Sequence, residues 1–238
     1  MQKAIIIGAT SGIGKALALL LADNGYKVGI TGRRENLLAK LDNEKPDSFC
    51  YLAFDITAEN LKENLNTITE KLGGLDLLIY SSGVGELNAD LKIELELPAV
   101  DVNVVAFNKV MVWAYQYFAQ QQSGQIAVIS SIAGLRGGAA APAYNASKAY
   151  QINYLEGLRQ KAKQQKLVLT ITDIRPGFVD TAMAKGEGKF WVAKPEKAAT
   201  QIHNAIKAKK TVIYVTRRWR IIAWFLKILP RFLYERIR

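Results

Sequence analysis

Short apolar runs alternate with longer amphipathic segments along nearly the whole chain. Brief runs rich in Ile, Leu and Val are typical of buried strands, and apolar positions that recur every three or four residues are typical of helices. The pattern predicts strands over 3–8, 27–32, 49–55, 75–81, 125–131, 167–174 and 211–216. It predicts helices over about 12–24, 34–43, 58–72, 97–121, 144–165 and 195–209.

The strict alternation of strand and helix predicts an α/β fold. Consecutive right-handed βαβ units build a doubly wound parallel sheet, here of about seven strands, with helices on both faces. We expect residues 1–216 to form this single domain and residues 217–238 to form an amphipathic C-terminal helical tail. Ligands of such a sheet bind at the carboxyl ends of the strands, so the residues that follow each strand are the candidates for chemistry.

The composition fits a domain of this kind in a reducing compartment. A chain of 238 residues, half of them hydrophobic, can bury a full core. Cys50 is the only cysteine, which excludes an intramolecular disulfide and predicts a cytoplasmic protein. The apolar stretch behind Met1 is too short for a secretory signal. The one histidine, His203, has no partner motif, so we expect no metal site.

A glycine-rich turn follows the first predicted strand and opens the first helix. Glycines let a ligand approach the backbone closely, and the free N–H groups and the dipole of a helix N-terminus attract a phosphate. We therefore expect the pyrophosphate of a dinucleotide to bind at this turn. The candidate residues are Gly8, Thr10, Ser11, Gly12, Ile13 and Gly14.

After the second predicted strand the chain is basic where NAD enzymes of this architecture carry an acid. A guanidinium presents a planar set of donors to a ribose 2′-phosphate, so Arg33 and Arg34 favour NADP (NADPH) over NAD, with Arg33 as the main contact. The alternative is two solvated arginines at a helix start. Asp55, after the third strand, either accepts a hydrogen bond from the adenine amino group or caps the next helix.

A tyrosine and a lysine stand four residues apart at the start of a predicted helix. Tyr144 and Lys148 therefore share one helix face, and a cation beside a phenol lowers the phenol pKa toward the working pH. A phenol tuned in this way can act as a general acid or base. Ser131 ends the fifth predicted strand, which brings its hydroxyl to the same edge of the sheet.

These segments fall in the order and spacing of the short-chain dehydrogenase/reductase (SDR) family. The chain resembles this family over residues 3–216, which implies a Rossmann fold and a nicotinamide cofactor. The resemblance implies that Tyr144 is the acid/base, that Lys148 tunes it and holds the nicotinamide ribose, and that Ser131 polarises a carbonyl. It also implies that Asn103 organises a water-linked proton path.

The same resemblance implies further cofactor contacts and one departure. The matching segments carry Asp55, Ile56, Ser82, Gly83, Pro176, Gly177, Val179 and Thr181, of which the last four hold the nicotinamide carboxamide. Where the family has Asn-Asn-Ala-Gly, this chain has Tyr80-Ser81-Ser82-Gly83, so a side-chain bridge between strands is lost. We expect Tyr80 to have a packing role.

The implied reaction is hydride transfer between NADP and a carbonyl or secondary alcohol, with a small-molecule substrate. The substrate lid, which includes Gly186, is short. Phe190 and Trp191 either give the cleft an apolar wall, which favours a bulky or lipophilic carbonyl, or pack under the following helix. Family members often pair through the helices that correspond to 97–121 and 144–165, so we expect a homodimer or homotetramer. The rival hypothesis is a membrane-attached NADP-binding scaffold or sensor with little turnover.

The net charge of +11 is greatest in the tail, where residues 217–238 hold seven Lys or Arg against one acid and so supply +6. No nucleic-acid-binding motif accompanies these charges, so we expect no nucleic acid partner. They are interleaved with Trp, Phe, Ile and Leu, which suits a lipid interface. The expected apolar stripe is Ile221, Ile222, Phe225, Leu226, Leu229, Phe232 and Leu233, opposite Arg220, Lys227, Arg231 and Arg238.

Three placements of the tail are open. Arg220 and Lys227 interrupt the apolar stretch, so it does not read as a transmembrane helix, and Pro230 is expected to kink or split it. The tail is expected to lie on an anionic membrane surface, which would make the protein peripheral on the inner face of a membrane. The alternatives are docking on the body over the substrate cleft or docking on a second subunit.

Overall fold

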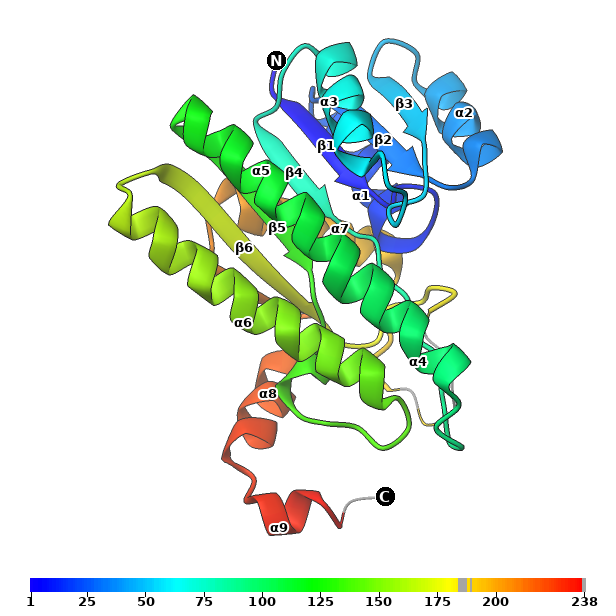
Figure 1. Ribbon diagram of the computed structural model, residues 1–238, viewed down its shortest axis with the longest axis vertical. Coiled ribbons are helices and arrows are strands. Elements are labelled where there is room, and N and C mark those ends of the chain that lie inside the picture. Colours follow the sequence, from blue (N-terminus) through cyan, green and yellow to red (C-terminus); the bar gives the residue numbers. More distant parts are fainter. Residues whose placement is uncertain (184–187, 189, 237–238) are drawn as a thin grey trace.

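A parallel sheet with helices on both faces forms the centre of the molecule (Figure 1). The computed structural model describes residues 1–183, 188 and 190–236, and within them the strand order is β3-β2-β1-β4-β5-β6-β7. The strands are β1 (Lys3–Ile7), β2 (Lys27–Gly32), β3 (Phe49–Ala53), β4 (Leu77–Tyr80), β5 (Ser123–Ile129), β6 (Val168–Pro176) and β7 (Val212–Val215). The predicted doubly wound α/β fold is confirmed.

The helices form two layers. One layer contains α1 (Gly12–Asp23), α2 (Glu35–Glu44) and α7 (Pro195–Lys207). The other contains α3 (Leu61–Leu72), α5 (Phe107–Gln121) and α6 (Pro142–Gln164). A helix α4 (Ile93–Val100) and a π-helical turn η1 (Asp101–Ala106) run directly into α5. The 3-10 turn η2 (Ile132–Leu135) follows β5, and α8 (Trp219–Ile228) and α9 (Arg231–Tyr234) form the C-terminal tail.

The central strands are buried on both faces, which explains their uninterrupted apolar runs. In β1, Ile5 and Ile7 pack into the core beneath α3, α5 and α6, whereas Ala4 and Ile6 pack into the core beneath α1 and α7. Successive side chains of a strand point to opposite faces, so a strand between two helix layers needs an apolar residue at every position.

Two helices begin earlier than the apolar pattern predicts. The helix predicted from residue 97 starts at Ile93, because Glu94 and Glu96 interrupt the apolar pattern but stabilise the positive end of the helix dipole. The helix predicted from residue 144 starts at Pro142, whose missing N–H group is not needed in a first turn. The start of α6 borders the cavity described below, because Ala141 and Tyr144 line that cavity.

The continuous helical segment Ile93–Gln121 has the length and apolar content of a membrane span. Its inner face nevertheless packs on the sheet, where Phe107, Val110 and Phe118 are fully buried. A helix with one face in the core of an α/β domain passes the same test of length and composition as a membrane span. We therefore describe it as a core helix.

The tail folds as two helices that separate at Pro230, which confirms the predicted split. The predicted single apolar stripe is wrong. Ile222 and Leu226 are half-buried on the side of α8 that packs against the body, whereas Trp224 and Ile228, which the stripe omitted, are exposed. The sequence does not distinguish a helix that is apolar on two sides from a helix with one broad apolar stripe. Arg238 lies outside the described residues.

Candidate active site

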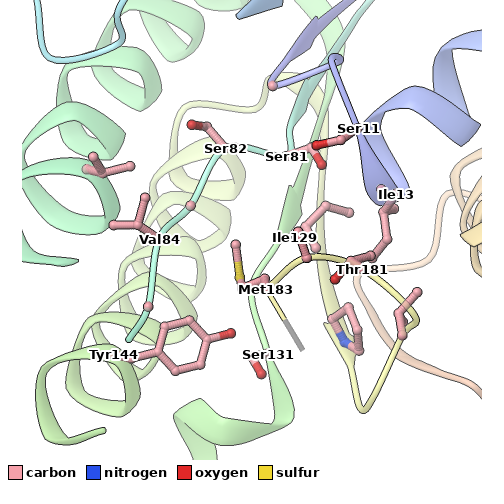
Figure 2. Close-up of a pocket in the computed structure, with 18 of the residues that line it drawn as sticks. Ser11, Ile13, Ser81, Ser82, Val84, Ile129, Ser131, Tyr144, Thr181 and Met183 are labelled. Atoms are coloured by element: carbon pink, nitrogen blue, oxygen red, sulfur yellow. The ribbon is translucent and has the colours of Figure 1, made fainter. Parts of the chain in front are cut away.

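A cavity of about 820 Å³ opens at the carboxyl ends of the strands, beside the neighbouring strands β1 and β4, where the strand order reverses. Its lining runs from the glycine-rich turn, past the ends of β2 to β5, to the segment after β6 and the first residue of α8. Figure 2 shows Ser11, Ser131 and Tyr144 placed around this space by different parts of the chain. The topology thus brings distant segments to one site.

The turn between β1 and α1 is shaped to hold a phosphate. Gly8 has a φ of +91°, which residues with a side chain rarely adopt. A Cβ atom on Gly14 would overlap the carbonyl oxygen of Gly8, so only glycine lets α1 start this close to β1. Ser11 precedes α1 without a side-chain cap hydrogen bond, which leaves the first N–H groups of the helix available to an anion. These features fit the pyrophosphate of a dinucleotide.

Arg33 and Arg34 follow β2 and both line the cavity, but they are held differently. Arg34 donates from Nη2 to the hydroxyls of Thr10 at 2.5 Å and Ser11 at 2.8 Å, which ties it to the glycine-rich turn. The Arg33 side chain is 70% exposed, and its Nη1 lies 3.7 Å from Oδ2 of Asp55. An ion pair this exposed contributes little, so the Arg33 guanidinium can exchange Asp55 for a ligand.

Asp55 lies after β3, at the wall of the cavity where the adenine is expected. Its Oδ1 accepts hydrogen bonds from the backbone N–H of Thr57 at 2.9 Å and from the Thr57 hydroxyl at 2.7 Å. The backbone bond is the main cause that holds the pKa of Asp55 below its usual value, against an opposing effect of burial. Because α3 begins only at Leu61, Asp55 caps the turn before that helix rather than the helix itself.

Tyr144 lies in the first turn of α6 and Ser131 at the start of η2, and Figure 2 shows both hydroxyl groups in the same part of the cavity. Burial raises the pKa of the Tyr144 phenol, and its hydrogen bond with Ser131 lowers it by less. The Ser131 Oγ also accepts from the N–H of Ala133 at 3.1 Å, which fixes its orientation. At neutral pH the phenol is therefore protonated and placed to give its proton to an oxygen beside Ser131.

Lys148 is buried one helical turn after Tyr144, and its Nζ lies 5.8 Å from the centre of the phenol ring. Nζ donates to the carbonyl of Ile129 at 3.0 Å and to Oε1 of Gln151 at 3.1 Å. Burial lowers the pKa of Lys148 to about 8, against an opposing effect of Asp173. The expected lowering of the Tyr144 pKa is wrong for this structure, because burial of the phenol is the largest effect on this pKa and raises it.

Asn103 is fully buried in the π-helical turn η1. Its Nδ2 donates to the carbonyl of Val84 at 2.7 Å and to the hydroxyl of Ser147 at 2.9 Å, and its Oδ1 accepts from the Val84 N–H at 3.0 Å. The side chain thus fastens the loop after β4 to α6. Its main-chain carbonyl accepts from Nε2 of Gln151 at 2.9 Å. Gln151 therefore joins the Asn103 carbonyl directly to Lys148.

The segment after β6 closes the remaining side of the cavity. The N–H of Gly177 donates to the carbonyl of Val215 at 2.7 Å, and Val179 forms an isolated parallel bridge with Ala193. Thr181, labelled in Figure 2, lies with its methyl group toward Gly12 of the glycine-rich turn. The predicted lid residue Gly186 lies outside the described residues.

In the part of the chain that the structure describes, no group of three or more His, Cys, Asp or Glu side chains is placed to hold a metal ion. His203 is buried in α7, where its ring lies edge-on to Tyr26 with the ring centres 6.0 Å apart. Burial lowers the pKa of His203. Its environment is that of a core side chain, away from the residues that line the cavity.

A family model described as short chain dehydrogenase matches residues 2–190. The chain belongs to the short-chain dehydrogenase/reductase family. It is an oxidoreductase of that family, with dependence on a nicotinamide cofactor, NAD or NADP.

Two other oxidoreductases are similar in sequence to most of this SDR chain. An uncharacterized oxidoreductase of Staphylococcus aureus (strain MW2) is 32% identical over 184 residues, which are 76% of this chain and 79% of that protein. An uncharacterized oxidoreductase of Myxococcus xanthus (strain DK1622) is 31% identical over 188 residues, which are 76% of this chain and 74% of that protein. These identities agree with the family assignment.

Solved structures share the fold. A short chain dehydrogenase from Bacillus anthracis superposes with a TM-score of 0.80 at 20% identity, covering 90% of this chain and 94% of that one. A short chain dehydrogenase/reductase from Burkholderia phymatum, solved in complex with NAD, gives a TM-score of 0.82 at 20% identity. That superposition covers 94% of this chain and 92% of the Burkholderia chain.

The SDR site residues predicted from the sequence are brought together by the fold. Those that line the cavity are Gly8, Thr10, Ser11, Gly12, Ile13, Arg33, Arg34, Asp55, Ile56, Ser82, Gly83, Ser131, Tyr144, Lys148, Pro176, Gly177, Val179 and Thr181. Two of the predicted site residues lie behind this lining. Gly14 packs against Gly8, and Oδ1 of Asn103 lies beside Gly83.

Tyr80, at the position where this chain departs from other SDR proteins, is fully buried, which confirms its packing role. Its hydroxyl donates to the carbonyl of Val102 at 2.9 Å, and its ring lies edge-on to Phe107 with centres 5.3 Å apart. Tyr80 thereby fastens β4 to the helical segment that carries Asn103. This contact from strand to helix lies where the resemblance implied the loss of a side-chain bridge between strands.

The two lid aromatics divide the two predicted roles: Phe190 belongs to the apolar wall of the cavity, and Trp191 packs against a helix. Phe190 lines the cavity and stacks on Trp219, the first residue of α8, with ring centres 5.0 Å apart. Trp191 packs edge-on against Trp219 and beneath the guanidinium of Arg218. The helix over these aromatics is α8 in the tail, not α7, which follows the lid in sequence.

Two site residues were not predicted from the sequence. Gln151 lies one turn after Lys148 on the same helix face, a spacing that could have indicated it. Trp219 had no such signal, because it lies in the tail beyond the segments that match the family. A Cβ atom on Gly177 would overlap the Trp219 ring, so this glycine is needed for α8 to pack over the cavity.

Replacing Gln151 with Leu is expected to shift the pH dependence of turnover. The Lys148 pKa of about 8 predicts that the rate of carbonyl reduction falls as the pH rises through 8 and the ammonium loses its proton. A hydrogen bond to a charged group contributes about 1.5–3 kcal/mol, and one pKa unit corresponds to about 1.4 kcal/mol. Without the Gln151 acceptor, the alkaline limb should therefore move down by about one pH unit or more.

The measurement is the pH profile of kcat and of kcat/KM for the parent and for two variants. Gln151→Glu keeps an acceptor beside Lys148 and adds a negative charge, so its alkaline limb should lie at or above that of the parent. A merely structural role for Gln151 predicts lower rates with an unmoved limb in both variants. Identical profiles for all three proteins would show that Gln151 does not position or tune Lys148.

Proposed function

We propose that this SDR enzyme is an NADP-dependent carbonyl reductase, which transfers hydride between NADPH and a bulky or lipophilic carbonyl, or in reverse from a secondary alcohol. The observation that carries the proposal is one cavity with two ends. The hydroxyls of Tyr144 and Ser131 converge at one end, beside the end of β5 (Figure 2). Arg33 follows β2, three strands away in the sheet, in place of an acid.

The chain's own residues divide the work of the reaction. A bound NADPH supplies the hydride. The hydroxyls of Ser131 and Tyr144 donate hydrogen bonds to the substrate oxygen, and Tyr144 gives up its proton as negative charge develops there. The Lys148 ammonium stabilises the resulting phenolate through space. A positioned general acid contributes about 10²–10⁴-fold, and a hydrogen-bond donor aimed at a developing oxyanion about 10²–10³-fold.

The protonation states support reduction as the working direction. The raised pKa keeps Tyr144 a proton donor at neutral pH, which reduction of a carbonyl requires. Oxidation of an alcohol needs the phenolate, whose formation burial disfavours. Lys148 remains charged below pH 8, so it can stabilise the phenolate that reduction leaves behind.

The apolar side chains that line the cavity support a lipophilic substrate. Phe190 and Trp219 stack along one wall, and Phe178 lies edge-on to Trp219 with ring centres 5.5 Å apart. Val84 and Met183 also line the cavity. Figure 2 shows the Met183 side chain in the space near the Tyr144 hydroxyl. Pockets bind apolar ligands through such surfaces, while a few polar groups fix the orientation of the ligand.

A panel of carbonyls with NADPH tests this substrate class. We expect kcat/KM to rise with the apolar size of aldehydes and ketones, and small sugars to be poor substrates. Phe190→Ala should lower kcat/KM for the large ketones and leave that for a small polar carbonyl nearly unchanged, which makes the small substrate an internal control. Preference for a small sugar, or the absence of turnover on every carbonyl, would contradict the proposal.

We also propose a cytoplasmic homodimer or homotetramer. An exposed apolar stripe runs along the outer side of α4, η1 and α5, and such a stripe on a soluble protein supports a subunit contact. Its members are Ile93, Leu97, Val100, Val105 and Val112. The mass of the protein in sedimentation velocity tests the oligomer, and the reduced state of Cys50 in whole cells tests the compartment.

A further inference from the structure

Helix α8 is apolar on two opposite sides. One side packs on the body through Trp219 and Ala223, which are buried. The other side bears four large apolar residues at helical spacings of three and four, which places them together. These residues, called the outer face of α8, are Ile221 (65% exposed), Trp224 (63%), Phe225 (49%) and Ile228 (54%).

The orientation of the outer face is fixed by contacts between the tail and the loop after η2. Arg136 donates from Nη1 to the carbonyls of Leu226 at 3.3 Å and Leu229 at 3.1 Å, at the end of α8. The Arg136 guanidinium lies 4.4 Å from the centre of the Tyr234 ring, and the Tyr234 hydroxyl donates to the carbonyl of Gly137 at 2.5 Å. The outer face therefore points away from the body.

Helix α9 extends this surface, and positive charge surrounds it. Phe232 and Leu233 of α9 follow the outer face of α8 in the sequence. They are 62% and 43% exposed. Among the tail residues that the structure describes, the one acid, Glu235, is paired with Arg231 at 2.6 Å. The exposed basic residues of the tail are Arg217, Arg218, Arg220, Lys227, Arg231 and Arg236.

We propose that the outer face of α8, with Phe232 and Leu233 of α9, is a docking surface for an anionic membrane. Apolar and aromatic side chains bordered by cations are the chemistry that enters a lipid interface and binds acidic headgroups. With ten residues at 1.5 Å each, α8 is about 15 Å long, half the thickness of a hydrocarbon core of about 30 Å. It therefore lies in the interface rather than across it.

The docking surface lies at the substrate end of the molecule. In Figure 1, α8 and α9 stand at the end toward which the strands point, and the cavity opens at those carboxyl ends. The inner side of α8 contributes Trp219 to the cavity wall, so one helix separates the cavity from the lipid. This placement suits the lipophilic substrate proposed above, and only that link rests on the proposed function.

Sedimentation with lipid vesicles tests the docking surface in the full-length protein. We expect binding to vesicles of phosphatidylcholine and phosphatidylglycerol at 3:1, much weaker binding to pure phosphatidylcholine, and partial release as salt rises. Electrostatic attraction is screened beyond about 10 Å at 0.1 M salt and beyond about 3 Å at 1 M, whereas apolar contact survives. The variant Ile221→Ser/Trp224→Ser/Phe225→Ser/Ile228→Ser should bind anionic vesicles at least about tenfold more weakly.

A pair of charge variants provides the matched control. Arg220→Gln/Lys227→Gln removes two charges beside the outer face and should lower binding to anionic vesicles. Lys161→Gln/Lys163→Gln removes the same charge from exposed positions at the end of α6 and should leave binding unchanged. Because these variants keep the apolar contacts of α8, they test the proposal even where the outer-face variant fails to fold. Circular dichroism and thermal unfolding report on folding in all of them.

Two results would overturn the proposal. The first is a parent protein that does not sediment with anionic vesicles; a smaller mass of the outer-face variant in sedimentation velocity would then make the surface a contact between subunits. The second is an outer-face variant, folded by circular dichroism, that binds vesicles as well as the parent. Neither result depends on whether the enzyme reduces a carbonyl.

Discussion

Replacing Tyr144 with Phe is expected to lower kcat for carbonyl reduction by about 10²–10⁴-fold, the contribution of a positioned general acid. The substitution removes one hydroxyl and keeps the ring, which packs against Gly85 of the loop after β4. It takes away both the proton that the forming alkoxide needs and one of the two donors to the substrate oxygen. NADPH binding should be retained, because the glycine-rich turn and the two arginines are untouched.

The measurement pairs single-turnover kinetics with a fluorescence titration of NADPH. Tyr154→Phe is the matched control, since Tyr154 is a half-buried phenol on the same helix that stacks on Tyr150 and does not line the cavity. We expect the control to keep nearly full activity. A Tyr144→Phe protein with unchanged turnover would remove Tyr144 from the mechanism. A parent that binds NADPH but turns over no carbonyl would favour the scaffold or sensor hypothesis instead.

The grouping of the proposed catalytic residues could be predicted because their geometry is local. Tyr144 and Lys148 are one helical turn apart, so their spacing alone places them on one side of α6. Ser131 follows β5 directly, and the strand order brings the end of β5 to the same edge of the sheet. The strand positions could also be predicted from local sequence, because burial on both faces demands apolar residues at consecutive positions.

Other features depend on contacts between distant segments, which spacing does not encode. Gln151 matters because the carbonyl of Asn103 lies within 2.9 Å of it, although the two residues are 48 apart in the chain. The protonation of Tyr144 depends on the burial of its hydroxyl, so reasoning from the Lys148 charge alone gave the wrong direction. In α8, Trp219 on one side and Trp224 on the other became distinguishable only when the body buried one of them.

The preference for NADPH over NADH should fall by about ten- to a hundredfold when Arg33 is replaced with Ala. A charge-assisted hydrogen bond contributes about 1.5–3 kcal/mol, and 1.4 kcal/mol is about tenfold in an equilibrium constant. The Arg33 side chain is largely exposed and has only a long ion pair with Asp55, so little is lost when it turns to a 2′-phosphate. The expected result is a higher KM for NADPH with nearly unchanged kinetics for NADH.

Arg34→Ala should behave differently, and the difference tests how the two arginines divide their roles. Arg34 holds the hydroxyls of Thr10 and Ser11 in the turn that receives the pyrophosphate, which NADH and NADPH share. Its loss should therefore weaken both cofactors in similar proportion. Lys40→Ala removes an equal charge from an exposed position on α2 and should change neither KM. Equal kcat/KM for NADPH and NADH in the parent would show that Arg33 does not select the 2′-phosphate. A selective loss of NADPH use in Arg34→Ala, with Arg33→Ala unaffected, would exchange their roles.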